Sequence, residues 1–363
     1  MPKTRAERLM ENAEGLDAII IANGDEPFLD STFWYLTEQT SGCFEHSYAV
    51  VRSDGSLDVI TNILEAETAR SAKGNVIVPE TKDQFKSCFE NALKGCRKIG
   101  FNYSCASYGA VTALEKFMPE GHELHNASDA IEKTVSVKDA KEIDATKEAC
   151  RISSRVASEI PDYLCEGITE KQVAARMDNR MRELGGTGNA FDTIAAFGAN
   201  SSQPHYMPGD HKLVRGEAAL FDFGTKYNRY CSDMTRTVFF GKPDSRLERA
   251  YEVVLEAQSA GIAEYRDGAE AKAADLAARK VIDESEFKGL FIHSFGHGIG
   301  QEVHQGIHVS PRSDQILKAG NIVSAEPGIY IPGVGGIRIE DTCLITENGC
   351  EILTSFDHSY TVI

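Results

Sequence analysis

The chain has 363 residues, of which 42% are hydrophobic and 26% charged, the composition of an ordinary globular protein long enough for two domains. Its 55 Asp and Glu residues outnumber its 38 Lys and Arg residues, and the resulting net charge of −17 repels nucleic-acid phosphates and anionic lipid. We therefore expect neither nucleic acid nor a membrane as a partner.

The cysteine pattern and the N-terminus predict a cytoplasmic protein. The nine cysteines are spread from Cys43 to Cys350 without a Cys-x-x-Cys pair, which argues against a disulfide framework and against a zinc knuckle. The first residues, Met-Pro-Lys-Thr-Arg-Ala-Glu-Arg, lack the apolar stretch of a signal peptide, and no run of about 18 apolar residues occurs. A reducing compartment is therefore expected.

The first third of the chain has the pattern of a small α/β domain. Short β-like runs alternate with charged helical stretches or follow Asp-Gly turns. Between residues 127 and 141 the sequence becomes polar and charged, without a Pro- or Gly-rich linker. We predict an N-terminal domain over residues 1–130 and a second domain over residues 131–363. The predicted strands of the first domain are 18–22, 47–51, 57–61 and 76–78.

The second domain begins with two predicted helices. The first has periodic apolar residues between Ile143 and Ile160, and the second begins at Thr169, with Gln172 completing a capping box. From residue 191 to residue 240 the period changes to that of strands and hairpins. The same order then repeats: a helix capped by Ser245 with Glu248, a helix over about 269–284, and strands from residue 291 onward.

This order suggests an internal repeat. Asp233 with Thr235 resembles Glu340 with Thr342 at an offset of 107 residues, and an acid matches an acid. Chance similarity between hydrophobic strands is the alternative explanation. A true repeat would give a pseudo-two-fold catalytic domain in which acids from both halves face one cleft. Four more pairs share a constant offset of 104: Leu213 with Leu317, Gly216 with Gly320, Asp222 with Glu326, and Gly224 with Gly328.

Four acids occupy positions where a charge is costly. Asp222 lies in Ala-Leu-Phe-Asp-Phe-Gly and Glu326 in Val-Ser-Ala-Glu-Pro-Gly, both apolar or β-rich runs. Asp233 and Glu340 show the same anomaly in Ser-Asp-Met-Thr and Ile-Arg-Ile-Glu-Asp-Thr. His297 stands between two glycines, which we expect to allow the close approach of a ligand. The charges of four carboxylates would be neutralised by two divalent cations.

Oxygen-rich ligands with one imidazole suit Mn²⁺, Co²⁺, Fe²⁺ or Zn²⁺. Mn²⁺ or Co²⁺ is our first expectation, with Zn²⁺ or Fe²⁺ as alternatives. Two such ions about 3.5–4 Å apart can share a water, lower its pKa and hold it as a bridging hydroxide beside a scissile carbonyl. One of the two glutamates, for which Glu326 is our candidate, would transfer the proton. For any single acid, a salt bridge or a turn cap is the alternative.

Together these motifs resemble those of the pita-bread metallopeptidases, the family of Xaa-Pro dipeptidase (prolidase), aminopeptidase P and methionine aminopeptidase. The resemblance implies that Asp222 and Asp233 chelate one metal and that His297 binds the other. It also implies that Asp233 and Glu340 reach both ions. The family's five ligands are matched in order and type by Asp222, Asp233 eleven residues later, His297 in His-Ser-Phe-Gly-His-Gly-Ile-Gly, Glu326 before Pro-Gly, and Glu340 in Arg-Ile-Glu-Asp.

The resemblance is strong over residues 130–363 and weaker over the first 130, where Phe-Trp-Tyr-Leu-Thr and the α/β pattern carry it. It implies an α+β fold: a pita-bread catalytic domain with a curved, mostly antiparallel sheet and a pseudo-two-fold repeat, preceded by a smaller α/β creatinase-like domain. Family precedent also implies a homodimer.

Four further residues match positions that the proline-specific relatives use around the substrate: His205, His293, His304 and Arg338. The resemblance implies that His304 and His205 donate hydrogen bonds near the scissile bond. His293 and Arg338 would border the pocket for the leaving residue, where a cation suits a carboxylate. For Arg338 an alternative role is to orient Glu340. A structural role is the general alternative for each histidine.

The predicted function is that of a two-metal exopeptidase, an Xaa-Pro dipeptidase that takes peptide substrates with proline after the scissile bond. Aminopeptidase P, which acts on longer peptides, is the first alternative. A metal-free creatinase-type hydrolase of carbon–nitrogen bonds and a non-catalytic binding module are more distant, because the five metal ligands are intact. One departure concerns substrate range: where relatives commonly read Val-His-Glu-Glu-Pro, this chain reads Val-His-Gln-Gly-Ile from Val303.

Overall fold

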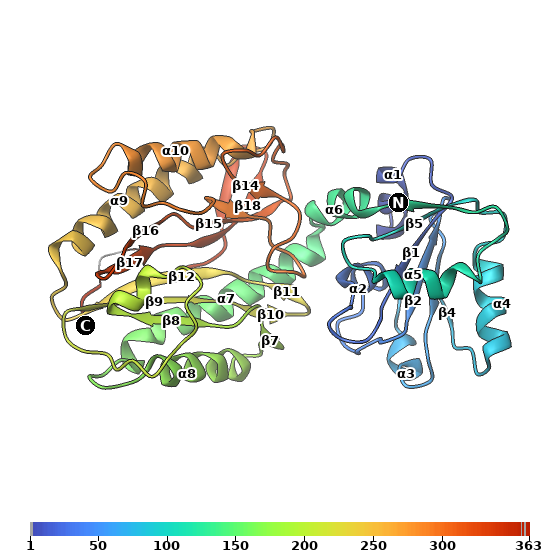
Figure 1. Cartoon of the computed structure of the whole chain (residues 1–363), viewed down its shortest axis with the longest axis horizontal. Helices are drawn as coiled ribbons and strands as arrows, with labels where there is room; N and C mark the ends of the chain where they lie inside the picture. The colour runs from blue at the N-terminus through green and yellow to red at the C-terminus, as the bar shows by residue number, and fades with distance from the viewer. Residues whose placement is uncertain (1–2, 357, 359–360) are drawn as a thin grey trace. The chain divides into compact units, whose positions relative to one another are not determined.

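A computed structural model describes residues 3–356, 358 and 361–363. The chain forms two compact units, the first ending at Val135 and the second beginning at Ser136 (Figure 1). No helix in the described part of the chain combines the length and hydrophobicity that crossing a bilayer requires.

The first unit is built on a six-stranded mixed sheet in the order β4-β3-β2-β1-β5-β6 (Figure 1). The β1–β2 and β2–β3 pairs are antiparallel, and the other three pairs are parallel. The four predicted strands are confirmed to within one residue. The strands are β1 (Ala18–Ala22), β2 (Tyr48–Arg52), β3 (Leu57–Ile60), β4 (Asn75–Ile77), β5 (Lys98–Phe101) and β6 (Glu123–Asn126).

Helices cover both faces of this sheet, which explains why β1 is apolar throughout. Ile19 and Ile21 join a core with α1 and α2, whereas Ile20 joins a second core with α4 and α5. The helices of this part are α1 (Arg5–Asn12), α2 (Ser31–Thr37), α3 (Ala66–Ala69), α4 (Lys82–Ala92), α5 (Tyr108–Glu115) and α6 (Ser128–Ser136), the last of which runs into the second unit.

The first half of the second unit packs two helices against antiparallel strands. The predicted capping box is confirmed, because the Gln172 backbone N–H donates to Thr169 Oγ1 at 3.3 Å and the Thr169 N–H donates to Gln172 Oε1 at 3.0 Å. The elements are α7 (Ala140–Tyr163), α8 (Glu170–Glu183), β7 (Gly188–Asn189), β8 (Ile194–Phe197), η1 (Gly198–Ser202), β9 (Glu217–Phe223), β10 (Thr225–Tyr227), β11 (Tyr230–Cys231) and β12 (Met234–Phe240).

The second half repeats this order, with strands that again pair in the antiparallel sense. Its two helices and several of its strands enclose the largest hydrophobic core. The elements are α9 (Ser245–Ile262), α10 (Ala271–Asp283), β13 (Gly296–His297), β14 (His308–Val309), β15 (Ile322–Ala325), β16 (Gly328–Ile331), β17 (Gly335–Arg338), β18 (Asp341–Thr346) and β19 (Gly349–Ile352) (Figure 1).

The backbone hydrogen bonds show that the repeat is structural. The Gly167 N–H donates to the Leu213 carbonyl at 2.8 Å, and the Gly268 N–H donates to the Leu317 carbonyl at 2.9 Å. Leu213 and Leu317 are one of the pairs matched at the offset of 104. Both halves therefore enter their second helix in the same way, and the predicted pseudo-two-fold arrangement is confirmed.

The prediction that Ser245 and Glu248 cap a helix is wrong. Ser245 is the first helical residue of α9, and the cap is Asp244, whose side chain accepts a hydrogen bond from the Arg246 N–H at 2.9 Å. Aspartate and serine are both good caps, so residue type alone does not choose between neighbours. The Arg246 guanidinium also pairs with the Asp244 carboxylate at 2.8 Å.

Candidate metal centre

The two halves present their acids at equivalent places on paired strands. In the first half, Asp222 on β9 lies opposite Thr235 on β12, and Asp233 immediately precedes β12. In the second half, Glu326 follows β15 and Glu340 precedes β18, two strands that pair along their length. The two halves meet where the Glu340 N–H donates to the Thr235 carbonyl at 3.1 Å and Thr235 Oγ1 donates to Glu340 Oε2 at 2.6 Å, which joins residues 105 positions apart in the sequence.

Three of the predicted ligands form one compact group. A ligand atom from each of Asp233, His297 and Glu340 lies within 4.8 Å of the other two. Glu326 joins them, because its Oε1 lies 3.1 Å from His297 Nε2, while Asp233 Oδ2 lies 3.5 Å from the same nitrogen. Asp222 is tied to the group through Arg338, which donates to its Oδ2.

Several carboxylate oxygens in this group lack a donor. Asp222 Oδ1, Asp233 Oδ1 and Glu340 Oε1 are buried without a hydrogen-bond partner among residues 3–356, 358 and 361–363. A buried carboxylate oxygen without a partner is strongly disfavoured in a protein interior. Oxygen atoms are also the ligands preferred by hard and borderline divalent cations. These residues therefore fit a divalent metal site.

The electrostatics of the metal-free site are unfavourable for the same reason. Burial raises the pKa of Asp233 well above its ordinary value, and the charges of Glu340 and Asp222 raise it further. Burial and the charges of Glu326 and Asp222 likewise raise the pKa of Glu340. The pKa of Asp222 is raised by burial, against the opposing charge of Arg338. Positive charge placed between these carboxylates would relieve the repulsion.

Glu326 and His297 behave differently because they neutralise each other. Burial raises the pKa of Glu326, but the hydrogen bond and charge of His297 outweigh it and bring the pKa to about 2. Burial lowers the pKa of His297, and its contact with Glu326 reverses that effect and raises it. In the metal-free protein, the contact between Glu326 and His297 thus favours the charged form of each group.

Arg338 helps to hold Asp222 and Glu340 in place through hydrogen bonds. Its Nη2 donates to Asp222, its Nε donates to Thr235 Oγ1 at 3.0 Å, and its side chain is 3% exposed. Thr235 Oγ1 in turn donates to Glu340 Oε2 at 2.6 Å. Arg338 therefore contacts Asp222 directly and reaches Glu340 only through Thr235.

Tyr330 connects this support to His293. Arg338 Nη1 donates to Tyr330 Oη at 2.7 Å, and Tyr330 Oη lies 2.8 Å from His293 Nε2. His293 Nδ1 lies 2.8 Å from the Ser294 carbonyl, so the ring donates there and accepts from Tyr330. Burial lowers the pKa of His293, in keeping with this neutral form. Sequence reasoning missed Tyr330, which is an ordinary aromatic residue of an apolar strand.

His304 lies against the metal-ligand group. Its ring centroid is 4.0 Å from that of His297, with the planes at 71°. Burial and the charge of His297 lower the pKa of His304, and His205 also contributes to the shift. His205 itself is exposed. Of the three predicted histidines, His205 and His304 are exposed to solvent and His293 is half-buried.

The glycines beside His297 have a different role from the predicted one. A Cβ on Gly296 would lie 2.2 Å from the Ser324 carbonyl oxygen, and one on Gly298 would lie 2.1 Å from that of Gln305. The atoms that approach these glycines belong to the protein's own backbone. The prediction that the glycines admit a ligand is corrected: they allow close packing of the strand and loop that hold His297.

Comparison with known proteins gives matches over both units. The sequence model of metallopeptidase family M24 matches residues 144–347, and that of the creatinase/prolidase N-terminal domain matches residues 4–134. The chain is 37% identical over 291 residues to the Xaa-Pro dipeptidase of Pyrococcus horikoshii, which covers 80% of this chain and 82% of that protein.

Solved structures of similar proteins superpose over almost the whole chain. An Xaa-Pro dipeptidase from Bacillus anthracis matches with a TM-score of 0.91 at 30% identity, covering 99% of both chains. An X-Pro aminopeptidase from Thermotoga maritima matches with a TM-score of 0.89 at 32% identity, covering 98% of this chain and 99% of that one. The predicted fold class, a pita-bread domain preceded by an α/β creatinase-like domain, is confirmed.

Proposed function

This chain belongs to metallopeptidase family M24, and from that membership we propose that it is a two-metal exopeptidase that cleaves the peptide bond preceding a proline. The observation that carries the proposal is the group of Asp233, His297 and Glu340, whose ligand atoms lie within 4.8 Å of one another. The buried carboxylate oxygens that lack a donor among the described residues add to it, because divalent cations would satisfy them.

We propose that two divalent cations are held by the five predicted ligands. The donor set of four carboxylates and one imidazole suits Mn²⁺ or Co²⁺ first, and Zn²⁺ or Fe²⁺ as alternatives. When bound, such ions lower the pKa of a water molecule and polarise the scissile carbonyl. The proposed ligands are Asp222, Asp233, His297, Glu326 and Glu340.

The surrounding side chains would supply orientation and proton transfer. Arg338 fixes Asp222 through its donated hydrogen bond, and Thr235 fixes Glu340. We assign proton transfer to Glu326, whose Oε1 also accepts a hydrogen bond from Ser324 Oγ at 3.1 Å. His304 and His205 would donate to the reacting carbonyl or to the substrate, and His293 would border the pocket for the leaving residue.

Two specificities remain candidates. The similarity to an Xaa-Pro dipeptidase over 80% of this chain favours cleavage of dipeptides. The similarity in structure to an X-Pro aminopeptidase, with a TM-score of 0.89, favours longer peptides. We place the dipeptidase first, because the relatives compared in sequence and in structure both include one.

The metal-free and the non-catalytic alternatives are disfavoured by the same buried oxygens. A metal-free hydrolase or a binding module on this fold would leave three carboxylate oxygens buried without a donor or a cation. Burying carboxylate oxygens in this way costs free energy, and a bound cation would offset that cost.

The test is hydrolysis of two paired substrates, a Met-Pro dipeptide and a longer Met-Pro-Xaa peptide, in buffer supplemented with Mn²⁺ or Co²⁺. Cleavage of the dipeptide alone would establish dipeptidase specificity, and preference for the longer peptide would establish aminopeptidase specificity. A matched reaction with a chelator is the control. If neither substrate is cleaved in a chelator-sensitive way, the proposal is wrong.

We propose three further properties of this protein. A homodimer follows from the family precedent. A cytoplasmic location is supported by buried thiols such as Cys150 and Cys343, which form no disulfide in the structure. The division into an N-terminal domain and a catalytic domain near residue 130 is supported by the two compact units.

A further inference from the structure

Arg236, a side chain that the proposed mechanism does not use, lies directly behind the ligand Glu340. Its guanidinium is 1% exposed and sits on β12, the strand that follows Asp233. Arg236 Nη1 donates to the Glu340 carbonyl at 2.5 Å and to the Thr235 carbonyl at 2.9 Å. One cation thus holds the backbone of a ligand and the backbone of the residue that orients it.

Asp341 neutralises Arg236. Arg236 Nη2 donates to Asp341 Oδ1 at 2.7 Å, and both side chains are almost completely buried. Gln258 Nε2 donates to the other oxygen of Asp341 at 3.0 Å. A buried ion pair is stable only when its remaining hydrogen-bonding groups are satisfied, so the other partners of Asp341 matter.

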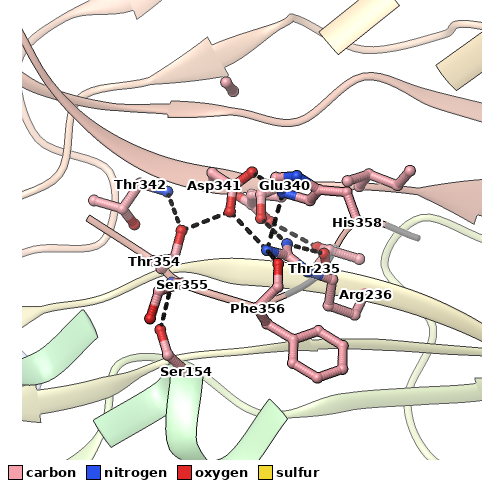
Figure 2. A network of polar contacts seen from close by, with 12 residues as sticks. Ser154, Thr235, Arg236, Glu340, Asp341, Thr342, Thr354, Ser355, Phe356 and His358 are labelled. Atoms are coloured by element: carbon pink, nitrogen blue, oxygen red, sulfur yellow. Dashed lines mark hydrogen bonds and ion pairs between the residues drawn. The ribbon is translucent and has the colours of Figure 1, made fainter. Parts of the chain in front are cut away.

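The remaining partners of the Arg236–Asp341 ion pair come from the C-terminal segment, residues 353–356 and 358 (Figure 2). Thr354 Oγ1 donates to Asp341 Oδ1 at 2.7 Å. His358 Nε2 lies 2.6 Å from Asp341 Oδ2 and acts as a donor, because an ionised carboxylate only accepts. The Phe356 carbonyl accepts from Arg236 Nη2 at 3.1 Å. The segment therefore completes the ion pair from one side.

The C-terminal segment is also linked to the proposed ligand Asp233 through Thr342. The Thr342 N–H donates to Thr354 Oγ1 at 3.2 Å. Thr342 Oγ1 donates to the Asp233 carbonyl at 2.7 Å and accepts from the Asp233 N–H at 3.2 Å. Thr354 is thus linked to Asp233 through Thr342. It is linked to Glu340 through Asp341, the next residue along the chain.

The segment is itself fixed to the rest of the unit. The Ser355 N–H donates to Ser154 Oγ on α7 at 2.8 Å, as Figure 2 shows. The Leu353 N–H donates to the Thr342 carbonyl at 2.8 Å. Further on, the Phe239 N–H donates to the Thr361 carbonyl at 2.9 Å, so the chain end pairs with β12. A segment anchored at several points can impose a position on the residues it contacts.

From these contacts we propose that the C-terminal segment positions Glu340 and Asp233 for the metal ions, acting through Asp341, Arg236 and Thr342. Its hydrogen bonds toward the site go to Asp341, Arg236 and Thr342 rather than to the proposed metal ligands, so its residues are positioning residues. The inference rests on the proposed metal centre. If the inference is right, the affinity for metal depends on the side chains of the C-terminal segment. A segment that only contributed to folding would affect stability but not metal affinity.

The test compares Mn²⁺ affinity with stability in Thr354→Val. This substitution keeps the shape of the side chain and removes the hydroxyl that serves both Asp341 and Thr342. Calorimetric titration of chelator-treated full-length protein with Mn²⁺ should show a loss of affinity of about tenfold to 100-fold, the usual effect of displacing a residue that orients a ligand. At saturating Mn²⁺ the kcat should return to near the wild-type value, and Thr354→Ser should restore affinity.

Two variants separate positioning from general destabilisation. Val173→Ala removes buried volume from the core of the same unit without touching the network, so it should lower the urea midpoint and leave Mn²⁺ affinity unchanged. Thr187→Val removes an exposed hydroxyl bonded to the Lys226 carbonyl and should change neither property. Mn²⁺ affinity in Thr354→Val that matches the wild type, or that falls no more than in Val173→Ala, would overturn the inference.

His358→Ala gives a second route if Thr354→Val does not fold. His358 is 32% exposed at the edge of the network, so its removal should be tolerated, and we expect a loss of Mn²⁺ affinity of about tenfold. His358→Gln, which keeps a donor, should recover part of it. Unchanged affinity in His358→Ala would also overturn the inference. A wild-type protein that binds no Mn²⁺, Co²⁺ or Zn²⁺ would instead overturn the proposed metal centre and this inference with it.

Discussion

Glu340 and Asp341 are consecutive acids, both buried, and they belong to two regions with opposite character. Glu340 faces the proposed metal centre, where its Oε1 has no hydrogen-bond donor among the residues the structure describes. Asp341 faces away from it and receives donors from Arg236, Thr354, Gln258 and His358. One step along the strand therefore separates a carboxylate with one oxygen that lacks a donor from a carboxylate whose two oxygens both receive donors.

The pKa values follow this difference. Burial tends to raise the pKa of both acids. For Glu340 the neighbouring carboxylates add to the effect, and its pKa is raised well above the usual range. For Asp341 the charge of Arg236 and the hydrogen bond with His358 outweigh burial, and its pKa is lowered. Burial alone thus does not distinguish a ligand from a structural acid, whereas the supply of donors does.

The largest expected effect is the loss of activity in Asp233→Ala. Removing a ligand shared by the proposed ions should lower kcat/KM by about 10³-fold or more, since metal activation contributes several kcal/mol to the transition state. In the presence of a chelator the variant should melt no lower than the wild type, because it has lost one of several repelling charges. Retained turnover would contradict the two-metal mechanism. Glu252→Gln, an exposed acid on α9, serves as the control.

The pair Glu340→Gln and Asp341→Asn tests the comparison directly. Without metal, Glu340→Gln should leave the free energy of unfolding unchanged or raise it, because it removes a repelling charge. Asp341→Asn should lower it by about 3–5 kcal/mol, because Arg236 is then buried without a counter-ion. Urea unfolding of both chelator-treated proteins measures the difference. Equal destabilisation of the two variants would show that the two acids are not energetically distinct.

Gly306→Ala tests how the loop that carries His304 is held in place by its backbone conformation and packing. Gly306 has φ +85°, follows His304 by two residues, and a Cβ there would lie 2.3 Å from Ser136 Oγ. We expect a loss of about 1–3 kcal/mol in stability from strain and overpacking, and a fall of about tenfold in kcat as His304 is displaced. Thermal melting and steady-state kinetics check the two effects.

Gly289→Ala is the matched control for this variant. Gly289 has φ +80°, but no atom lies within 4 Å of the position a Cβ would take. It should therefore show only the backbone strain, about 1–2 kcal/mol, with kcat unchanged. If both variants lose the same activity, the contact with Ser136 has no role in placing the His304 loop.

The smallest effect is expected for Glu159, a surface analogue of Asp341. Glu159 accepts from Arg180 Nε at 2.8 Å and from Tyr163 Oη at 2.7 Å, and the hydrogen bond with Arg180 is the main reason that its pKa falls to about 2. A lowered folded-state pKa stabilises the protein above the unfolded value of 4.5, and this stability is lost as the pH falls toward 2. Glu159→Gln should cost about 0.5–1 kcal/mol at pH 7.

The pH dependence provides the check on this prediction. The difference in melting temperature between wild type and Glu159→Gln should shrink steadily between pH 5 and about pH 2. Glu183→Gln, which removes a more exposed partner of Arg180, should have a smaller effect at every pH. A difference that stays constant with pH would mean that the carboxylate charge of Glu159 does not stabilise the fold.

The sequence by itself determined the fold class and singled out the acids of the proposed metal centre. Asp222 and Glu326 stand out because a charge in an apolar strand is improbable without a function, and the same reasoning reaches Asp233 and Glu340. Strand alternation and the capping box at Thr169 are local properties, so they could be read from short stretches of sequence. The repeat was visible because both halves use the same residue types at a constant spacing.

The tertiary structure alone decided which donors each acid receives. Tyr330 and the C-terminal segment carry no sequence signal, because hydroxyl and amide donors are common and their partners can lie far away in the sequence, as Ser355 and Ser154 do at a separation of 201 residues. Thr235 was noticed as part of the repeat, but its hydrogen bond to Glu340 was not predicted.

The role of the glycines beside His297 was wrongly predicted for the same reason, since a crossing backbone decides it. The cap of α9 was placed one residue too late, although the contacts of Asp244 with Arg246 are local. The sequence shows which residue type stands at each position, whereas packing decides which hydrogen-bond partners that residue receives. Packing leaves one oxygen of Glu340 without a donor among the described residues and supplies donors to both oxygens of Asp341.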